Sequence, residues 1–232
     1  MLFCACNRQN LQHEQDRFCT KSGKTLDFTC IKHSSIRLTY GETEIEFDPV
    51  ENIEPKTDYS TIPKADYIFV THEHYDHFDT TAIKKLSKPT TKIITNKKCR
   101  ETLGRGKAME NGDKIELQGI LVEAVPAYNT TPENLKFHPK GRDNGFVVTI
   151  DGLRIYVAGD TEDIPEMKHL KNIDIAFLPC NQPYTMTPKQ LANAAKMINP
   201  KVLYPYHLGD TDINEIVKEL QGCNIEIRIR NF

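Results

Sequence analysis

Tryptophan is absent from this chain of 232 residues, and so is any long run of apolar residues. A membrane-spanning helix needs about 20 consecutive, mostly apolar residues, so the sequence excludes an integral membrane protein of that kind. The chain also lacks a large excess of either charge, because 30 basic and 32 acidic residues leave a net charge of −2. Nucleic acid is therefore not expected as a partner, since its binding surfaces are basic. The hydrophobic content of 38% predicts one globular domain with a substantial core.

Disulfide bonds are not expected either, because the seven cysteines are scattered and odd in number. Cys4 and Cys6 form a C-x-C pair, which is either a metal-binding element or part of a terminal tail. The order of apolar residues, cysteine and a polar run over residues 1–17 is similar to the end of a bacterial lipoprotein signal. We therefore expect a cytoplasmic protein or, if a signal peptide precedes the given start, a lipid-anchored envelope protein. Residues 1–25 are predicted to be a polar leader or tether, and residues 26–232 the folded domain.

Two series of short β-prone segments run along the predicted domain, and helical patterns follow each series. The predicted strands cover residues 26–32, 36–40, 44–47, 66–71, 92–95, 113–117, 120–125, 146–150, 154–158, 174–178, 201–204 and 225–229. Helices are predicted from Thr80 onward, over residues 188–198 with Thr187 as N-cap, and over residues 212–220. This order favours an α/β protein of two mixed sheets packed together with helices outside, a four-layer αββα sandwich. A single doubly wound parallel sheet is the alternative.

A dense histidine cluster follows the strand at 66–71 and has the pattern H-x-H-x-D-H. Its members are His72, His74, Asp76 and His77. Imidazole nitrogen and carboxylate oxygen are ligands for zinc and related metals, whereas an ordinary core or surface has no use for such a pattern. The cluster lies on a strand-to-helix loop, where open α/β sheets place their ligands. The sequence therefore predicts a metal site on this loop.

Three further side chains could complete a metal centre. Asp160 follows the strand at 154–158, His207 follows the strand at 201–204, and His138 lies in a long loop before the strand at 146–150. Each alone is open to a simpler interpretation, as an Asx-turn or an ordinary loop histidine. Together they supply ligands from three distant connections, as a two-metal centre requires.

The motifs T-H-E-H-Y-D-H, A-G-D-T at 158–161 and P-Y-H at 205–207 resemble those of the metallo-β-lactamase superfamily. His33, the F-D-P at 47–49 and the T-M-T-P at 185–188 are similar to the ascorbate-6-phosphate lactonase-like branch. The P-A at 126–127 and the G-F-V at 145–147 are similar to the N-acyl-phosphatidylethanolamine-hydrolysing phospholipase D. The resemblance covers about residues 26–230 and implies the αββα fold.

The resemblance also implies a ligand set for two divalent ions, Zn²⁺ or alternatively Mn²⁺. His72 and His74 would hold one ion, Asp76, His77 and His207 the other, and Asp160 would bridge them. The third histidine of the first ion is expected on the loop between the two halves. Asn129 occupies the position where the phospholipase has a histidine, so His138 is the predicted ligand, with Asn129 as the weak alternative.

The predicted function is that of a metal-dependent hydrolase with a metal-bound hydroxide as nucleophile. It would act on an ester, lactone, phosphodiester or amide bond of a small-molecule substrate. The predicted catalytic residues are Asp76, Asp160, which would orient the hydroxide, and His33, which would donate a proton or bind substrate. A di-iron redox or sensory protein with the same ligands is the alternative.

Other residues near the motifs have weaker assignments. Asp48 is either an acceptor for a ligating imidazole or part of an Asp-Pro turn. Lys140 and Arg142 either receive an anionic substrate group or are solvated loop charges. Met186 is expected to pack beneath the site, because a thioether is too soft for zinc or manganese in such a site.

Overall fold

The structure is a computed structural model that describes residues 13–232. Its strands form two seven-stranded sheets. The first sheet comprises β1 (Gln15–Cys19), β2 (Thr25–Lys32), β3 (Ser35–Tyr40), β4 (Thr43–Phe47), β5 (Ala65–Val70), β6 (Ser87–Thr95) and β7 (Lys107–Ala108). The second comprises β8 (Lys114–Leu117), β9 (Ile120–Ala127), β10 (Asp143–Ile150), β11 (Leu153–Val157), β12 (Ile175–Pro179), β13 (Val202–Tyr206) and β14 (Glu226–Ile227).

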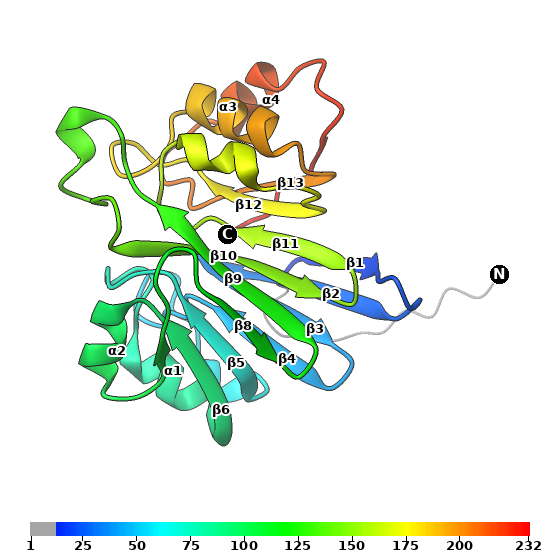
Figure 1. The fold of residues 1–232 in the computed structure, drawn as a ribbon, viewed down its shortest axis with the longest axis vertical. Helices are drawn as coiled ribbons and strands as arrows, with labels where there is room; N and C mark the ends of the chain where they lie inside the picture. Colours follow the sequence, from blue (N-terminus) through cyan, green and yellow to red (C-terminus); the bar gives the residue numbers. More distant parts are fainter. Residues whose placement is uncertain (1–12) are drawn as a thin grey trace.

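Helices cover the outer faces of the two sheets (Figure 1). Helices α1 (Thr80–Leu86) and α2 (Lys97–Leu103) lie outside the first sheet, and α3 (Pro188–Ile198) and α4 (Ile213–Glu219) outside the second. Three short 3₁₀ helices, η1 (Tyr59–Thr61), η2 (Pro132–Asn134) and η3 (Pro165–His169), lie in connections. The predicted αββα sandwich is confirmed, and the single doubly wound sheet is wrong.

Both sheets follow the same topology, with their strands in chain order. Strands β1 to β4 pair antiparallel and β4 to β7 parallel. Strands β8 to β11 likewise pair antiparallel and β11 to β14 parallel. Because parallel strands end at the same edge of a sheet, the loops after β5, β11 and β13 can meet.

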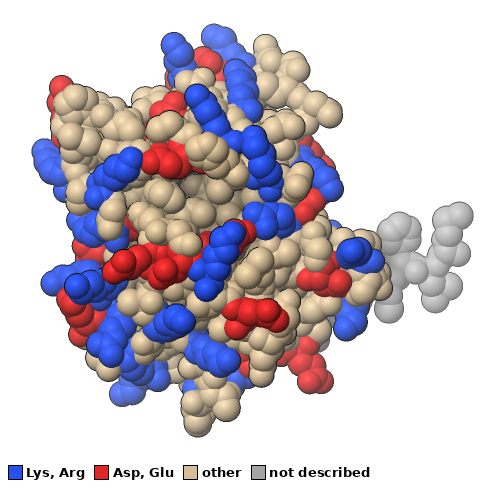
Figure 2. Space-filling view, in the orientation of Figure 1, with Lys and Arg blue, Asp and Glu red and all other residues tan. Residues whose placement is uncertain are grey.

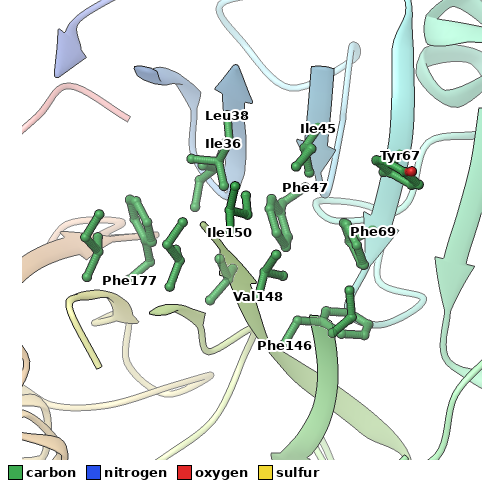
Figure 3. Packing of buried hydrophobic residues seen from close by; sticks show 14 of the residues in the cluster. Ile36, Leu38, Ile45, Phe47, Tyr67, Phe69, Phe146, Val148, Ile150 and Phe177 are labelled. Atoms are coloured by element: carbon green, nitrogen blue, oxygen red, sulfur yellow. The ribbon is translucent and has the colours of Figure 1, made fainter. Parts of the chain in front are cut away.

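Aromatic side chains join the two sheets near that edge. Phe47 at the end of β4 stacks on Phe69 of β5, with ring centroids 4.9 Å apart, and Phe69 lies 5.3 Å from Phe146 of β10 (Figure 3). All three are fully buried, and burial of each side chain stabilises the fold by roughly 1.5–3 kcal/mol. This contact fixes the loops after β4 and β5 beside β10.

Helix α3 forms where the sequence predicts it. Thr187 caps its first turn by accepting a hydrogen bond from the backbone N–H of Gln190 at 3.2 Å, and Pro188 occupies the first position. The apolar residues at helical spacing, Leu191, Ala194, Ala195 and Ile198, are buried against the second sheet. The helix ends at Asn199, whose backbone is left-handed.

The start of the folded domain needs a correction. Residues 15–19 form β1, which pairs antiparallel with β2, so the predicted leader over residues 1–25 extends too far into the chain. The segment is polar because one face of this edge strand is exposed. Cys4, Cys6 and the lipoprotein-like pattern lie outside the described residues. The described cysteines, Cys19, Cys30, Cys99, Cys180 and Cys223, are free.

The described helices are all too short or too polar to cross a membrane. On the face shown in Figure 2, basic and acidic side chains are interspersed.

Candidate metal centre

The predicted ligands meet where strand-end loops of both sheets converge. His72 to His77 follow β5, Asp160 follows β11, His207 follows β13, and His138 lies before β10. A hydrogen bond from the backbone N–H of Asn144 to the carbonyl of Thr71, at 3.2 Å, holds the two halves together at this point.

The side chains form two groups. One contains His72, His74, His138 and Asp160, and the other contains His33, Asp76, His77 and His207. Within each group, one ligand-type atom per residue lies within 4.8 Å of the others. All seven predicted ligands are therefore brought together, and apart from Asp160, which was expected to bridge the two ions, they divide as the resemblance implies. His33 joins the second group, with its Nε2 3.2 Å from Asp76 Oδ2.

Asp160 lies between the two groups. Its Oδ2 is 3.3 Å from His138 Nε2 and 3.5 Å from His207 Nε2, and its Oδ1 is 3.2 Å from His77 Nε2. The carboxylate thus reaches nitrogen atoms of both groups, as a bridging residue would.

Partners outside the two groups orient the imidazole rings. His77 lies with its Nδ1 2.8 Å from Asp48 Oδ2, and His138 lies with its Nδ1 3.0 Å from Asp143 Oδ2. His72 Nδ1 is 3.0 Å from the hydroxyl of Thr71. In each ring Nε2 then faces the group, where that of His72 lies 3.1 Å from His74 Nδ1. Of the two interpretations of Asp48, its contact with His77 fits that of an acceptor for the imidazole, and this arrangement is typical of metal-bound histidines.

The sequence analysis did not identify Asp143, which orients His138, or Asn181. The Nδ2 of Asn181 lies 3.3 Å from His207 Nδ1. Asp143 is five residues after His138, and Asn181 lies two residues after the buried end of β12. Strand-end position was the available signal for Asn181, as it was for Asp160.

Three buried polar atoms of the centre show that it fits metal ions. His77 Nε2, His138 Nε2 and Asp160 Oδ1 have no hydrogen-bond partner among residues 13–232. His77 Nε2 and Asp160 Oδ1 are close, but their geometry is not that of a hydrogen bond. Buried polar atoms are normally paired, because each unpaired one costs about 1–3 kcal/mol. Imidazole nitrogens and carboxylate oxygens aimed at a common point suit a divalent ion.

The charges of the centre are strongly coupled. Burial alone would raise the pKa of Asp76, but hydrogen bonds with His207 and His33 hold it below its usual range. Burial would likewise raise the pKa of Asp160, but the nearby histidines His207 and His77 hold it well below its ordinary value. Both carboxylates are therefore ionised at neutral pH and available as ligands.

The histidines of the centre differ in the direction in which their pKa is shifted. Burial would lower the pKa of His138, but Asp143 and Asp160 raise it to about 9. For His77, Asp160 and Asp48 likewise overcome burial and raise the pKa well above its ordinary value. Burial holds the pKa of His72 well below that value. A metal ion would thus have to displace protons from His77 and His138 at neutral pH.

Three residues of the centre have a backbone that non-glycine residues rarely adopt. The φ angles of His33, Asp48 and His207 are 47°, 42° and 50°. Such conformations cost of order 1 kcal/mol or more and persist where function fixes them.

Asn129 and Met186 lie apart from the ligand groups. The amide Nδ2 of Asn129 donates hydrogen bonds to the backbone carbonyls of Tyr184 at 2.8 Å and Asn134 at 3.2 Å. The structure therefore brings His138, and not Asn129, into the first group. Met186 is buried in the apolar cluster outside the second sheet, as a packing residue.

A cavity of about 340 Å³ opens beside the two groups. It is lined by His33, Ile53, His74, Tyr75, Asp76, Phe137, His138, Asp160, Asn181 and Tyr184. A small molecule could enter it and reach both groups.

Comparisons with known proteins agree with this geometry. The Beta-lactamase superfamily domain matches residues 27–207. A UPF0173 metal-dependent hydrolase of Symbiobacterium thermophilum is 32% identical over 215 residues, which cover 84% of this chain and 89% of that protein. The crystal structure of a protein from Parabacteroides distasonis is 55% identical, with a TM-score of 0.92, and the match covers 95% of this chain and all of that one. Igni18, a metallo hydrolase from Ignicoccus hospitalis, shares the fold at 24% identity, with a TM-score of 0.75 over 89% of this chain and 95% of its own.

Proposed function

This chain belongs to the β-lactamase superfamily and is a metal-dependent hydrolase, and we propose that it holds two divalent metal ions. His72, His74 and His138 would hold the first ion, and Asp76, His77 and His207 the second, with Asp160 between them. Zinc suits these nitrogen and carboxylate donors best, and manganese(II) accepts the same set.

The orientation of the buried imidazoles carries this proposal. In His72, His77 and His138, the Nδ1 atom contacts a fixed oxygen, so that Nε2 faces the centre. A purely structural histidine cluster would pair both ring nitrogens with protein atoms. Here two of the inward Nε2 atoms, those of His77 and His138, lack such partners among residues 13–232.

The proposed reaction is the hydrolysis of an ester, lactone, phosphodiester or amide bond. Bound metal ions supply an activated water and polarise the bond that is cleaved. Water adds to the carbonyl or phosphoryl centre, the bond to the leaving oxygen or nitrogen breaks, and the leaving atom takes up a proton. Asp160, ionised and placed between the two groups, would accept a hydrogen bond from the attacking water and so orient it.

His33 is proposed to bind the substrate or to supply the proton to the leaving atom. It lines the cavity, and its Nε2 contacts Asp76 Oδ2 at 3.2 Å. Its ring lies 3.9 Å from that of His207, so it is also close enough to be an additional ligand. His33→Ala separates these roles. A proton donor predicts unchanged metal content with a lower kcat, whereas a ligand predicts loss of metal.

Substitution of the proposed ligands tests the function. His72→Ala and Asp160→Ala should each lower turnover of a responsive substrate at least 100-fold, in a screen of esters, lactones, phosphodiesters and amides. His169→Ala is the matched control, because His169 is exposed and lies outside both groups. Wild-type turnover in both ligand variants would overturn the proposal.

A further inference from the structure

The cavity beside the metal centre is lined by two kinds of side chain. Besides the proposed ligands, His33 and Asn181, it is lined by four apolar or aromatic residues, which we call the wall: Ile53, Tyr75, Phe137 and Tyr184. The rings of Phe137 and Tyr184 meet edge to face, with centroids 4.9 Å apart. The wall therefore joins the loop before β10 to the loop before α3.

Exposed apolar side chains gather around this cavity. In the described part of the chain, four large hydrophobic residues are exposed: Tyr75 at 82%, Leu135 at 45%, Tyr184 at 44% and Val217 at 41%. Tyr75 and Tyr184 belong to the wall, and Leu135 is two residues from Phe137. Exposed apolar surface that is concentrated at a cavity indicates a binding surface.

Cationic side chains are missing from the same cavity. Among residues 13–232, no lysine or arginine lines it. The nearby cations are already engaged. The ammonium of Lys32 donates to the carbonyls of Glu51, Ile53 and Pro55, at 3.1, 2.6 and 3.1 Å, and so fixes the loop that carries Ile53.

Three cations near His138 do not line the cavity either, and two of them are paired with carboxylates. Arg142 donates to Asp143 Oδ2 at 2.8 Å and to the carbonyl of Phe137 at 2.7 Å. Lys140 donates to Glu166 Oε1 at 2.8 Å. Lys136 lies over the ring of Phe137, 5.0 Å from its centroid, and does not line the cavity. A phosphate or carboxylate in the cavity would therefore find no lysine or arginine among the lining residues.

We infer that the substrate is a carboxylic ester, lactone or amide that presents an uncharged, apolar acyl or aryl group to the wall. This inference rests on the proposed function and narrows its range of substrates. It excludes substrates that carry a phosphate or carboxylate group in addition to the bond that is cleaved. Hydrolysis adds water across the acyl C–O bond, or across the acyl C–N bond of an amide. The acyl carbon gains the hydroxyl group, the leaving oxygen or nitrogen gains the proton, and the products are a carboxylic acid and an alcohol or amine.

Binding of three hydroxamic acids tests the inference without relying on turnover. Acetohydroxamic acid, hexanohydroxamic acid and the monohydroxamate of succinic acid share a metal-binding head and differ in the tail. Calorimetric titration of the zinc-loaded full chain should show at least tenfold tighter binding of the hexanoyl than of the acetyl compound. The succinyl compound, whose tail ends in a carboxylate, should bind no more tightly than the acetyl compound.

Variants of the wall make the test specific. Tyr184→Ala and Phe137→Ala should each reduce the advantage of the hexanoyl tail to less than threefold. Tyr184→Arg should instead give the succinyl tail an advantage of fivefold or more over the acetyl compound. Val217→Ala is the matched control, since Val217 is exposed on α4 and does not line the cavity, and it should keep the wild-type preference.

The outcomes separate this inference from the proposed function. Equal binding of the three tails to the wild type, or tightest binding of the succinyl compound, would overturn the inference and leave the metal centre in place. Failure of all three compounds to bind more tightly to the zinc-loaded chain than to the metal-free chain would overturn the proposed function, and the inference with it.

Discussion

His138 lies with its Nδ1 3.0 Å from Oδ2 of Asp143, and both side chains are buried. Arg142 holds the same carboxylate through its Nε at 2.7 Å. Asp143 is thus fixed from one side and in turn fixes the ring of His138, with Nε2 toward Asp160. Binding of the first ion would therefore depend on Asp143, a residue that would not itself touch the metal.

Removal of Asp143 should weaken metal binding without removing a ligand. Asp143→Ala is expected to lower the zinc affinity of the first group about 10- to 100-fold, the usual effect of losing such a partner. Asp143→Asn, which can still accept from His138, should have a smaller effect. Competition with a chromophoric chelator measures both affinities, and Glu116→Ala, an exposed carboxylate on β8, is the control. Equal zinc affinity in Asp143→Ala and wild type would contradict the orienting role.

His138 and Asn129 should respond differently to substitution. His138→Ala removes an inward nitrogen and is expected to leave one tightly held zinc ion per chain. Asn129→Ala should keep both ions but lower the free energy of unfolding by about 1–3 kcal/mol, because it removes the two hydrogen bonds that its amide donates to the carbonyls of Tyr184 and Asn134. Metal analysis after gel filtration and urea unfolding distinguish the two. If Asn129→Ala lost zinc and His138→Ala did not, Asn129 and not His138 would be the ligand.

Glu46 should make stability depend on pH. It is fully buried on β4, and Arg37, which also contacts Glu44 at 3.0 Å, lies 3.0 Å from its Oε2. Burial raises the pKa of Glu46 to about 8, against the opposing charge of Arg37. Because the folded pKa exceeds the ordinary value of 4.5, this contribution to stability is complete below that value. It is lost as the pH rises toward about 8.

Glu46→Gln cannot ionise and should remove this dependence. Relative to wild type, its free energy of unfolding should rise by up to about 1.4 kcal/mol per pH unit between about pH 5 and 8. Urea unfolding of both proteins across this interval measures the difference. A difference that stays constant with pH would show that Glu46 is ionised throughout.

Gly145 should tolerate no side chain. A Cβ atom there would lie 2.7 Å from the carbonyl oxygen of Ala158 and 3.1 Å from that of Val157, and backbone atoms cannot move aside as a flexible side chain can. Gly145→Ala is therefore expected to lower the free energy of unfolding by about 1–3 kcal/mol. Because Ala158 leads into the loop of Asp160, zinc affinity should fall too. Thermal unfolding and zinc titration measure both effects, and unchanged values would show that β10 and β11 can separate.

The parts of the centre differ in how far the sequence predicts them. His72 to His77 are contiguous, so the motif alone identifies them. Asp160 and His207 were predictable because each follows a buried strand, and the topology brings such ends together. The roles of Asp143 and Asn181 depend on which ring each side chain meets after folding, and no local pattern encodes that contact.

The strands and helices also differ in how far the sequence predicts them. Strands with buried apolar patterns and the capped helix α3 were predicted closely, because their pattern reflects burial. The edge strand β1 was missed, since its exposed polar residues look like a tether and only pairing with β2 makes it a strand. Helix α2 was missed as well, because Cys99 is its only buried residue.

We have proposed that this hydrolase holds two divalent ions in the two side-chain groups. Elemental analysis of the purified full chain after equilibration with zinc, joined to a visible spectrum of the protein as isolated, tests it most directly. We expect two ions of zinc or manganese per chain, no absorption band in the visible range, and at most one ion in Asp160→Ala. One metal ion or fewer per wild-type chain, or two irons with visible absorption, would contradict the two-ion centre.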